Sequence, residues 1–336
     1  MDAAISGGVD TTVRLHHIST TLDEVRRHAV EASRRGPGLT RLFAQVLGSH
    51  DLPVKCVEHN TATGLVVSGG WDSTLRLWDP RSPDGPARCV GNLPLPGRVY
   101  AMATSNKRLV VATADKRIQI YDLRSLRAGA APLQQRESPL KYQIRTLRCM
   151  PDGRGYAASS VEGRVALDFF DDAESTASRY AFKCHRRTEA GKETVYPVNA
   201  LGASPSWMPL LRASCPRAHP PAAHAAFHPV HGTFATGGCD GYVNMWDGVA
   251  KKRLFVLPKF PSSIAALSFN HDGTRLVRLQ APGDAPSREC SGSRACTQAI
   301  ASSYTYEEGE KDHPPDAVYV RSMSDAEVTA KPRAPA

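Results

Sequence analysis

Four residues carry side chains whose chemistry suits a peptide-docking surface. Arg145, Arg164 and Lys183 are cations, and Trp71 offers a flat apolar surface. A guanidinium pairs bidentately with a carboxylate or a phosphate, whereas the Lys ammonium acts as a point charge. A single such cation is more often a solvated surface residue. Whether the four form a site therefore depends on the elements that position them.

A repeated phrase in the sequence shows which elements those are. Residues 69–79 read GGWDSTLRLWD, residues 237–247 read GGCDGYVNMWD, and less regular copies begin near residues 8, 114 and 161. In each copy a turn acid precedes a strand of alternating apolar residues; the acids are Asp10, Asp72, Asp115, Glu162 and Asp240. This pattern is typical of the WD repeat, whose units of about 40–45 residues each form one four-stranded blade of a β-propeller.

The residue types of the repeat have physical roles. The turn acid can accept hydrogen bonds from backbone amides of the tight loop, while the apolar side chains and the Trp can fill the space between neighbouring blades. One blade cannot bury its faces alone, so the copies must pack against one another. We therefore expect an all-β fold, a seven-bladed-type WD-repeat β-propeller, with intact blades over residues 54–81, 99–123 and 141–185.

Three stretches interrupt the repeats. Prolines follow Leu201 closely enough to remove the amide donors that a ladder needs, and residues 280–298 are rich in Pro, Gly, Ser and Arg. Residues 22–45 are basic and suited to a partly helical linker. The expected organisation is a blade remnant at 1–18, a linker at 19–50, a propeller at 51–332 with disordered inserts at 201–225 and 278–299, and a tail at 333–336.

Composition narrows the class of protein. The eight cysteines include no CxxC pair, which favours reduced thiols in a cytosolic or nuclear setting. The chain has no apolar run near eighteen residues and no signal-type start, so we expect a soluble, non-secreted protein. The formal charge of +9 favours an acidic or phosphorylated partner, and nucleic acid fits a basic surface equally well at this level.

Other residue combinations give little support for catalysis or metal binding. The histidines near Cys215 and Cys239 match no standard zinc spacing; they are His219, His224, His228 and His231. Cys184 and His185 are neighbours on an expected strand, so their side chains should point to opposite faces rather than form a dyad. The Gly pairs of the repeats precede no helix and are not phosphate loops. We therefore expect no metal, no cofactor and no enzymatic activity.

Several segments do not belong to the generic repeat; they are residues 137–145 (ESPLKYQIR), 160–166 (SVEGRVA), 180–186 (YAFKCHR), 196–200 (YPVNA), 234–244, 251–254 and 301–307. Together they resemble the budding-uninhibited-by-benzimidazole propeller of the spindle assembly checkpoint, over residues 51–200, 226–277 and 300–332. The messenger-RNA export propeller is a near relative. Against the seven-bladed family, the chain is expected to lack the first blade and the opening half of the second. One hypothesis is that the inserts are translated intron or misassigned exon. The competing hypothesis is that the chain is a splice form that folds poorly.

The resemblance implies a non-catalytic adaptor that recruits checkpoint kinases to kinetochores. It would bind short acidic segments of those kinases and a phosphorylated Met-Glu-Leu-Thr repeat of a kinetochore scaffold. Carried over by motif, Arg145, Arg164 and Lys183 would anchor anionic groups, and Trp71 would be an apolar platform. The expected locations are the nucleus, the mitotic kinetochore and chromosome, and the cytoplasm. Ubiquitin, membranes and nucleic acid are not expected partners. The alternatives are an mRNA-export propeller that uses its basic charge for RNA, or a non-functional truncated product.

Overall fold

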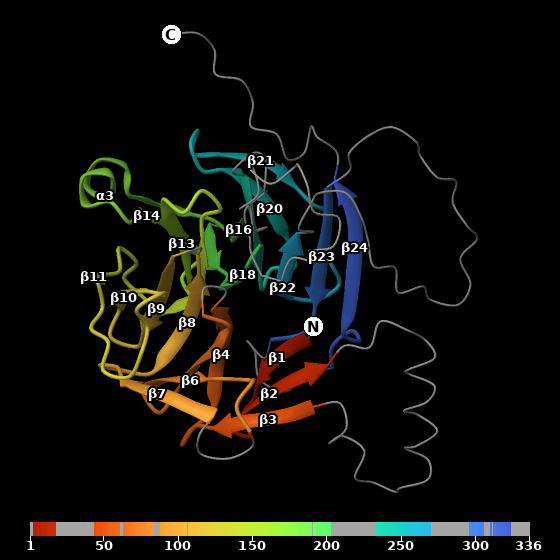
Figure 1. Ribbon diagram of the computed structural model, residues 1–336. Helices are drawn as coiled ribbons and strands as arrows, with labels where there is room; N and C mark the ends of the chain where they lie inside the picture. Colours follow the sequence, from red (N-terminus) through yellow and green to blue (C-terminus); the bar gives the residue numbers. More distant parts are fainter. Residues whose placement is uncertain are drawn as a thin grey trace, which may run out of the picture. The chain divides into compact units, whose positions relative to one another are not determined.

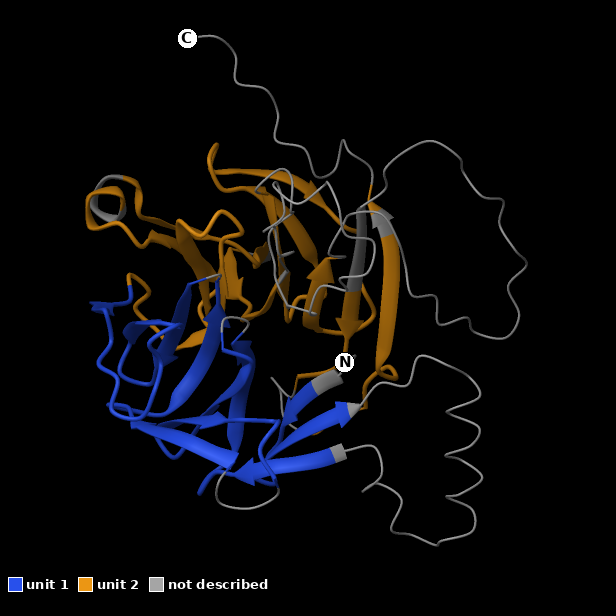
Figure 2. Ribbon diagram, viewed as in Figure 1, with its two compact units in different colours: residues 1–138, 219–221 blue, residues 139–218, 222–336 orange. Residues whose placement is uncertain are grey.

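The computed structural model describes residues 3–17, 44–60, 63–83, 88–105, 107–189, 191–202, 233–269, 296–305, 310 and 312–323. They fall into two compact units, shown in Figure 2: unit 1 comprises residues 1–138 and 219–221, and unit 2 comprises residues 139–218 and 222–336. Nearly every described element is a β-strand (Figure 1). Within these ranges, no helix combines the length and the apolar character needed to cross a membrane.

Unit 1 consists of antiparallel sheets in which each strand pairs with the next one along the chain. The first sheet is β1 (Ala3–Gly7), β2 (Thr12–His17) and β3 (Ala44–Ser49); the second is β4 (Val54–Asn60), β5 (Leu65–Gly70), β6 (Thr74–Trp78) and β7 (Cys89–Pro94); the third is β8 (Val99–Thr104), β9 (Arg108–Thr113), β10 (Arg117–Asp122) and β11 (Gln134–Glu137). Tight turns of the WD phrase join neighbouring strands, which is why the order in each sheet follows the sequence.

The larger apolar cluster of unit 1 lies between its second and third sheets, and a smaller one joins its first and second sheets. The central strands β5 and β9 are buried along almost their whole length, whereas the outer strand β7 alternates between buried and exposed side chains. Leu75, Leu77 and Leu93 from one sheet pack in a cluster with Leu109 and Val111 from the next. A sheet that is covered on both faces produces such continuous apolar strands, and their burial is the main stabilising contribution.

Unit 2 repeats the same construction. Its sheets are β12 (Ile144–Cys149), β13 (Gly155–Ser160), β14 (Arg164–Phe169) and β15 (Tyr180–Lys183); then β18 (Val198–Gly202), β19 (Thr233–Gly238), β20 (Val243–Asp247) and β21 (Lys252–Val256); then β22 (Ile264–Phe269), β23 (Cys296–Ser302) and β24 (Ala317–Met323). The helix α3 (Asp172–Ser178) and a hairpin of β16 (Arg186–Glu189) and β17 (Lys192–Val195) are additions that the repeat pattern did not predict.

The all-β WD-repeat fold expected from the sequence is confirmed, and each of the three intact repeats forms a four-stranded sheet. Two strands extend into stretches expected as linker or insert. Strand β3 pairs with β2 inside the range 19–50, and β23 begins at Cys296 inside the range 278–299 because its ladder with β24 runs seven residues. Residues 18–43, 203–232 and 270–295 lie outside the described part of the chain. The remaining domain boundaries and the number of blades stay predictions.

Candidate anion-binding site

Two of the cations expected from sequence face one another in unit 2. Arg164 begins β14 and Lys183 ends β15, and these two residues are direct partners in the antiparallel register. Opposite residues of such a pair project from the same face of a sheet with their Cβ atoms about 5 Å apart, and like charges placed there repel. Lys183 is exposed, and the Arg164 side chain is 34% exposed. An anion bound between the two cations would remove this repulsion.

Arg145 reaches the same end of the sheet through an irregularity of its strand. Ile144 pairs with Ser160, but Thr146 pairs with Ser159, so Arg145 is the unpaired extra residue of a β-bulge in β12. Asn199 holds the same position in the next sheet, between Val198 and Ala200 of β18. A bulge bends its strand and re-aims the side chain of the extra residue. Bulges therefore set the direction of both side chains.

The two bulge residues contact each other. The Nε of Arg145 donates a hydrogen bond of 3.0 Å to Oδ1 of Asn199, whose Nδ2 lies 2.9 Å from Oγ1 of Thr305 and 3.1 Å from Sγ of Cys239. The terminal nitrogens of Arg145 make no hydrogen bond or ion pair with the described residues. Asn199 thus orients the guanidinium of Arg145, and the two terminal nitrogens of that group can bind a ligand.

The turn before Arg164 adds the turn acid Glu162 and a further cation, Arg186, which the sequence did not single out as a site residue. Glu162 Oε2 lies 3.3 Å from Nε of Arg164, and the backbone oxygen of Glu162 accepts a 2.9 Å hydrogen bond from Nη2 of Arg186. Arg186 also pairs with Glu193 of the hairpin at 3.1 Å. Gly163 completes this turn at a φ of 62°, where an added Cβ would lie 2.7 Å from the Cys184 carbonyl oxygen. The hairpin and the turn are therefore held together.

Trp71 lies in unit 1, in the corresponding turn between β5 and β6. Its backbone amide donates to the Pro53 carbonyl at 2.9 Å, and its side chain is 39% exposed. The equivalent position in the β19–β20 turn is Cys239. An aromatic ring that remains partly exposed next to a rigid turn is suited to packing against an apolar side chain. The structure thus places Trp71 as a partly exposed residue of unit 1, whereas the three cations belong to unit 2.

Two buried hydrogen-bond networks support the turns, one in each unit. In unit 1, Trp78 Nε1 donates to Ser68 Oγ at 2.7 Å, Ser68 lies 2.6 Å from His50 Nε2, and His50 Nδ1 lies 2.9 Å from Asp72 Oδ2. In unit 2 the same sequence of contacts runs through Trp246, Thr236, His185 and Asp240, at 2.9, 2.8 and 2.9 Å. The turn Asp therefore accepts from a buried His as well as from loop amides.

Burial sets the ionisation of the unit 1 network. It lowers the pKa of the His50 imidazole below its ordinary value, although the Asp72 carboxylate opposes this effect. Burial alone would raise the pKa of the Asp72 carboxyl, but hydrogen bonds from Thr74, the Asp51 amide and His50 lower it overall. A neutral His50 can donate from Nδ1 to the ionised Asp72 carboxylate and accept the Ser68 hydroxyl at Nε2.

Cys184 and His185 follow β15 instead of lying on it, and His185 has a φ of 48°, so the expected alternation of strand side chains does not apply to them. Cys184 is buried, and burial raises the pKa of its thiol well above the ordinary range. His185 is engaged by Asp240 and Thr236. No group of three His, Cys, Asp or Glu side chains in the described ranges could hold a metal ion. Cys215 and the four histidines weighed as zinc ligands, His219, His224, His228 and His231, lie outside those ranges.

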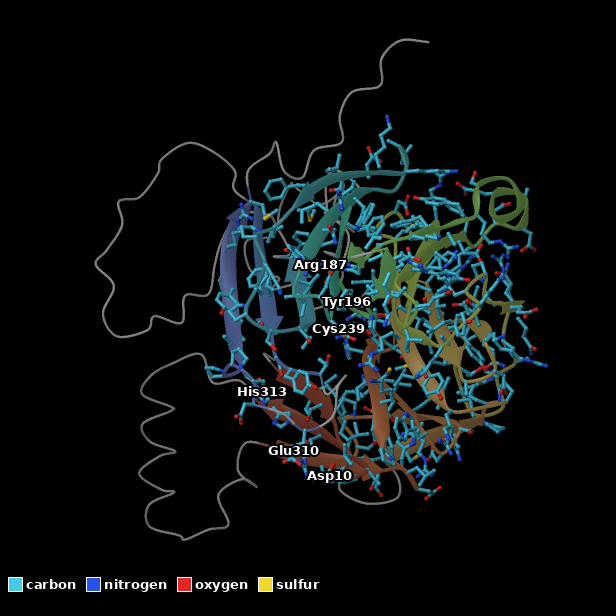
Figure 3. All side chains as sticks on the ribbon, turned by 180° about the vertical axis from the view of Figure 1, so that it is seen from behind. Asp10, Arg187, Tyr196, Cys239, Glu310 and His313 are labelled. Carbon is cyan, nitrogen blue, oxygen red and sulfur yellow. The ribbon has the colours of Figure 1, made fainter. Side chains whose placement is uncertain are left out.

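A cavity of about 590 Å³ lies within unit 2 beside Asn199. Arg187, Tyr196 and Cys239, labelled in Figure 3, line it together with Phe260 and Lys259. Its walls also include the prolines 197, 261 and 314. Because Cys239 contacts Asn199, which orients Arg145, the cavity adjoins the bulge that carries this cation. The lining is mixed, because the acids Asp240 and Asp312 stand beside Arg187 and Lys259, so the cavity has no single charge preference.

The comparisons with known proteins agree with this repeat architecture. The family model described as "WD domain, G-beta repeat" matches residues 42–79 and 216–247. The Arabidopsis thaliana mitotic checkpoint protein BUB3.1 is 48% identical over 290 residues, which cover 86% of this chain and 71% of that protein. The Caenorhabditis elegans mitotic checkpoint protein bub-3 is 38% identical over 331 residues, 97% of this chain and 75% of the relative.

A third relative is the mRNA export factor GLE2 of Chaetomium thermophilum, 36% identical over 234 residues, which cover 69% of this chain and 57% of that protein. The repeats and sheets define a WD-repeat protein. The chain belongs to the Bub3 family of mitotic checkpoint proteins. The resemblance found in the sequence segments around Arg145, Arg164 and Lys183 is thereby confirmed, as is the more distant likeness to the export propeller.

Proposed function

We propose that the protein is a non-catalytic adaptor of the spindle assembly checkpoint. It binds acidic segments of checkpoint kinases and phosphorylated peptides of a kinetochore scaffold, and so brings the kinases to kinetochores in mitosis. Arg145, Arg164 and Lys183 are the anion anchors, and Trp71 is the apolar platform. The protein works in the nucleus, at the mitotic kinetochore and in the cytoplasm.

The observation that carries the proposal is the direct pairing of Arg164 with Lys183 across β14 and β15. A protein gains nothing in stability from two facing cations, so an arrangement of this kind supports an anionic ligand. Arg145 adds a guanidinium whose Nε is held by Asn199. The membership of the Bub3 family supports checkpoint partners in general.

Calorimetric titration with a phosphorylated Met-Glu-Leu-Thr peptide tests the proposal. The wild-type protein should bind the peptide, and Arg164→Ala and Lys183→Ala should each weaken it about 10-fold or more, because each removes a charge-assisted contact. Arg179→Ala is the matched control, since Arg179 is an exposed cation just before the other end of β15. An equal loss in Arg179→Ala would show a general effect of net charge and contradict a defined site.

The export-factor relative supplies the second candidate function, an RNA-binding propeller. The same variants separate the two. The export function would be favoured if the protein bound RNA more tightly than the phosphopeptide. That RNA affinity should then fall steeply with salt and be unaffected by Arg164→Ala. Peptide binding that is lost in Arg164→Ala, without salt-steep RNA affinity, favours the checkpoint adaptor.

A further inference from the structure

Glu162 is an acidic residue set among the cations that are proposed to bind an anion. Its carboxylate lies 3.3 Å from Arg164, and Arg164 is directly opposite Lys183. We propose that Glu162 is an internal carboxylate that a ligand must displace, so that Arg164 and Lys183 favour a phosphate dianion over a single carboxylate, and an acidic segment without phosphate needs more than one carboxylate to bind there. This inference rests on the proposed function, because it concerns the ligand of the same site.

The geometry shows an incomplete pairing between Glu162 and its neighbours. Although Oε2 of Glu162 is within ion-pair distance of Nε of Arg164, the two atoms do not meet hydrogen-bond geometry. Oε1 of Glu162 and the Nε atoms of Arg164 and Arg186 are buried and make no hydrogen bond with the described residues. A buried polar atom without a partner is unfavourable, because it has lost its hydrogen bonds to water. The contact is therefore one that a better acceptor can replace.

The backbone of this turn is held independently of the Glu162 side chain. Arg186 Nη2 donates to the Glu162 carbonyl oxygen, the Cys184 amide donates to the Gly163 carbonyl at 2.9 Å, and the Glu162 amide lies 3.3 Å from Ser160 Oγ. The carboxylate can swing away from Arg164 while the turn keeps its shape. Displacement thus requires only a rotamer change of one partly buried side chain, whose exposed fraction is 16%.

The charges decide which ligand can displace the carboxylate. Replacing Glu162 at Arg164 by another single carboxylate exchanges one ion pair for an equivalent one, with no gain in Coulomb energy. A phosphorylated side chain carries about −1.5 to −2 charges and three acceptor oxygens, enough to pair with Arg164 and Lys183 together. A phosphate group can therefore displace the Glu162 carboxylate from Arg164, whereas a single Asp or Glu side chain of the ligand cannot.

Titration of the full chain with two peptides tests this role. One peptide carries phosphothreonine in a Met-Glu-Leu-Thr sequence, and the other carries Glu in place of that residue. Glu162→Gln should tighten binding of the phosphopeptide about 5-fold or more, and should bring binding of the Glu peptide into the measurable range. Glu193→Gln is the matched control: Glu193 is 48% exposed and pairs with Arg186 rather than Arg164, so its loss should change either affinity by less than about 2-fold.

The outcomes separate this inference from the proposed function. Wild-type binding of the phosphopeptide, with unchanged or weaker binding in Glu162→Gln, would overturn the proposed role of Glu162 and leave the adaptor function standing. Absence of wild-type binding would overturn both. Glu162→Asp, which keeps the charge on a shorter side chain, checks for misfolding: it should melt like the wild type and bind the phosphopeptide with intermediate affinity. Loss of phosphopeptide binding in both folded variants would show that Glu162 positions Arg164 for the ligand instead.

Discussion

Replacing Asp72 by Asn should selectively destabilise unit 1. The Asp72 carboxylate accepts hydrogen bonds from Thr74 Oγ1 at 2.8 Å, from the Thr74 amide at 3.2 Å and from the Asp51 amide at 3.1 Å. It also lies 2.9 Å from His50 Nδ1 and 3.4 Å from Arg76 Nη2, and its side chain is only 5% exposed. Asp72→Asn replaces one acceptor oxygen by an NH2 group, which is itself a donor and cannot accept hydrogen bonds from these groups.

The size of the effect follows from the contacts that are lost. Hydrogen bonds to a charged group contribute about 1.5–3 kcal/mol each, and one of the two oxygens is removed, so we expect a loss of about 2–4 kcal/mol in the free energy of unfolding. Asp240, the equivalent residue of unit 2, contacts only His185 and the Tyr242 amide in the described ranges. Asp240→Asn should therefore be milder, at about 1–2 kcal/mol. Asp115→Asn is the control at an exposed turn acid and should stay within about 0.5 kcal/mol.

Hydrogen exchange followed by mass spectrometry can assign each loss to its unit, because peptides report on local opening. Asp72→Asn should speed exchange in β4–β6, and Asp240→Asn should speed exchange in β18–β20. Equal destabilisation by all three substitutions, or faster exchange in the wrong unit, would refute the role given to the His–Asp networks.

Three further results are expected. Burial lowers the pKa of His50 in the folded protein below its ordinary value of 6.5, so the unfolded chain takes up the proton more readily. The contribution of His50 to the free energy of unfolding is therefore fully present above pH 6.5 and is lost as the pH falls below that value. Melting temperatures at pH 7.5 and 5.5 measure this, and a higher melting temperature at pH 5.5 would contradict it. Gly163→Ala should lower the free energy of unfolding by about 2 kcal/mol or more, because the new Cβ would clash with the Cys184 carbonyl and the backbone has a positive φ. Gly153→Ala is also at a positive φ but has open space around it, so it should lower that free energy by only about 1 kcal/mol. Urea unfolding measures both values. The Cys184 thiol, whose pKa is raised by burial, should resist N-ethylmaleimide at pH 7.5 in the folded protein while the half-buried Cys89 reacts; equal labelling rates would show that the sheet opens.

The repeats were readable from the sequence because their pattern is local. Asp72 and Trp78 are six residues apart, as are Asp240 and Trp246, and the alternating strands between them predict a hairpin. The His of each network was missed because its distance along the chain varies. His50 precedes Ser68 by 18 residues, whereas the hairpin β16–β17 and further residues separate His185 from Thr236. A partner at a variable distance leaves no fixed spacing to recognise.

In the candidate site too, the residue types could be predicted from the sequence, but their neighbours in space could not. The cross-strand pairing of Arg164 with Lys183 follows from the length of the β14–β15 connection, which sequence alone did not give. The bulge at Arg145 and its contact with Asn199 depend on a one-residue shift between neighbouring strands, and no propensity predicts that shift. Glu162 was identified as a turn acid like Asp72, but it pairs with Arg164 rather than with a buried His. Side-chain neighbours across strands depend on register, which a single sequence specifies weakly.

The most direct test of the adaptor account is to locate the bound peptide. A phosphorylated Met-Glu-Leu-Thr peptide with a photoreactive residue beside the phosphothreonine can be cross-linked to the protein and mapped by mass spectrometry. If the three cations hold the peptide, cross-links should fall within residues 143–146, 160–165 and 182–187 and should be lost in Arg164→Ala. Cross-links that concentrate near Arg154 and Arg179 and persist in Arg164→Ala would contradict it.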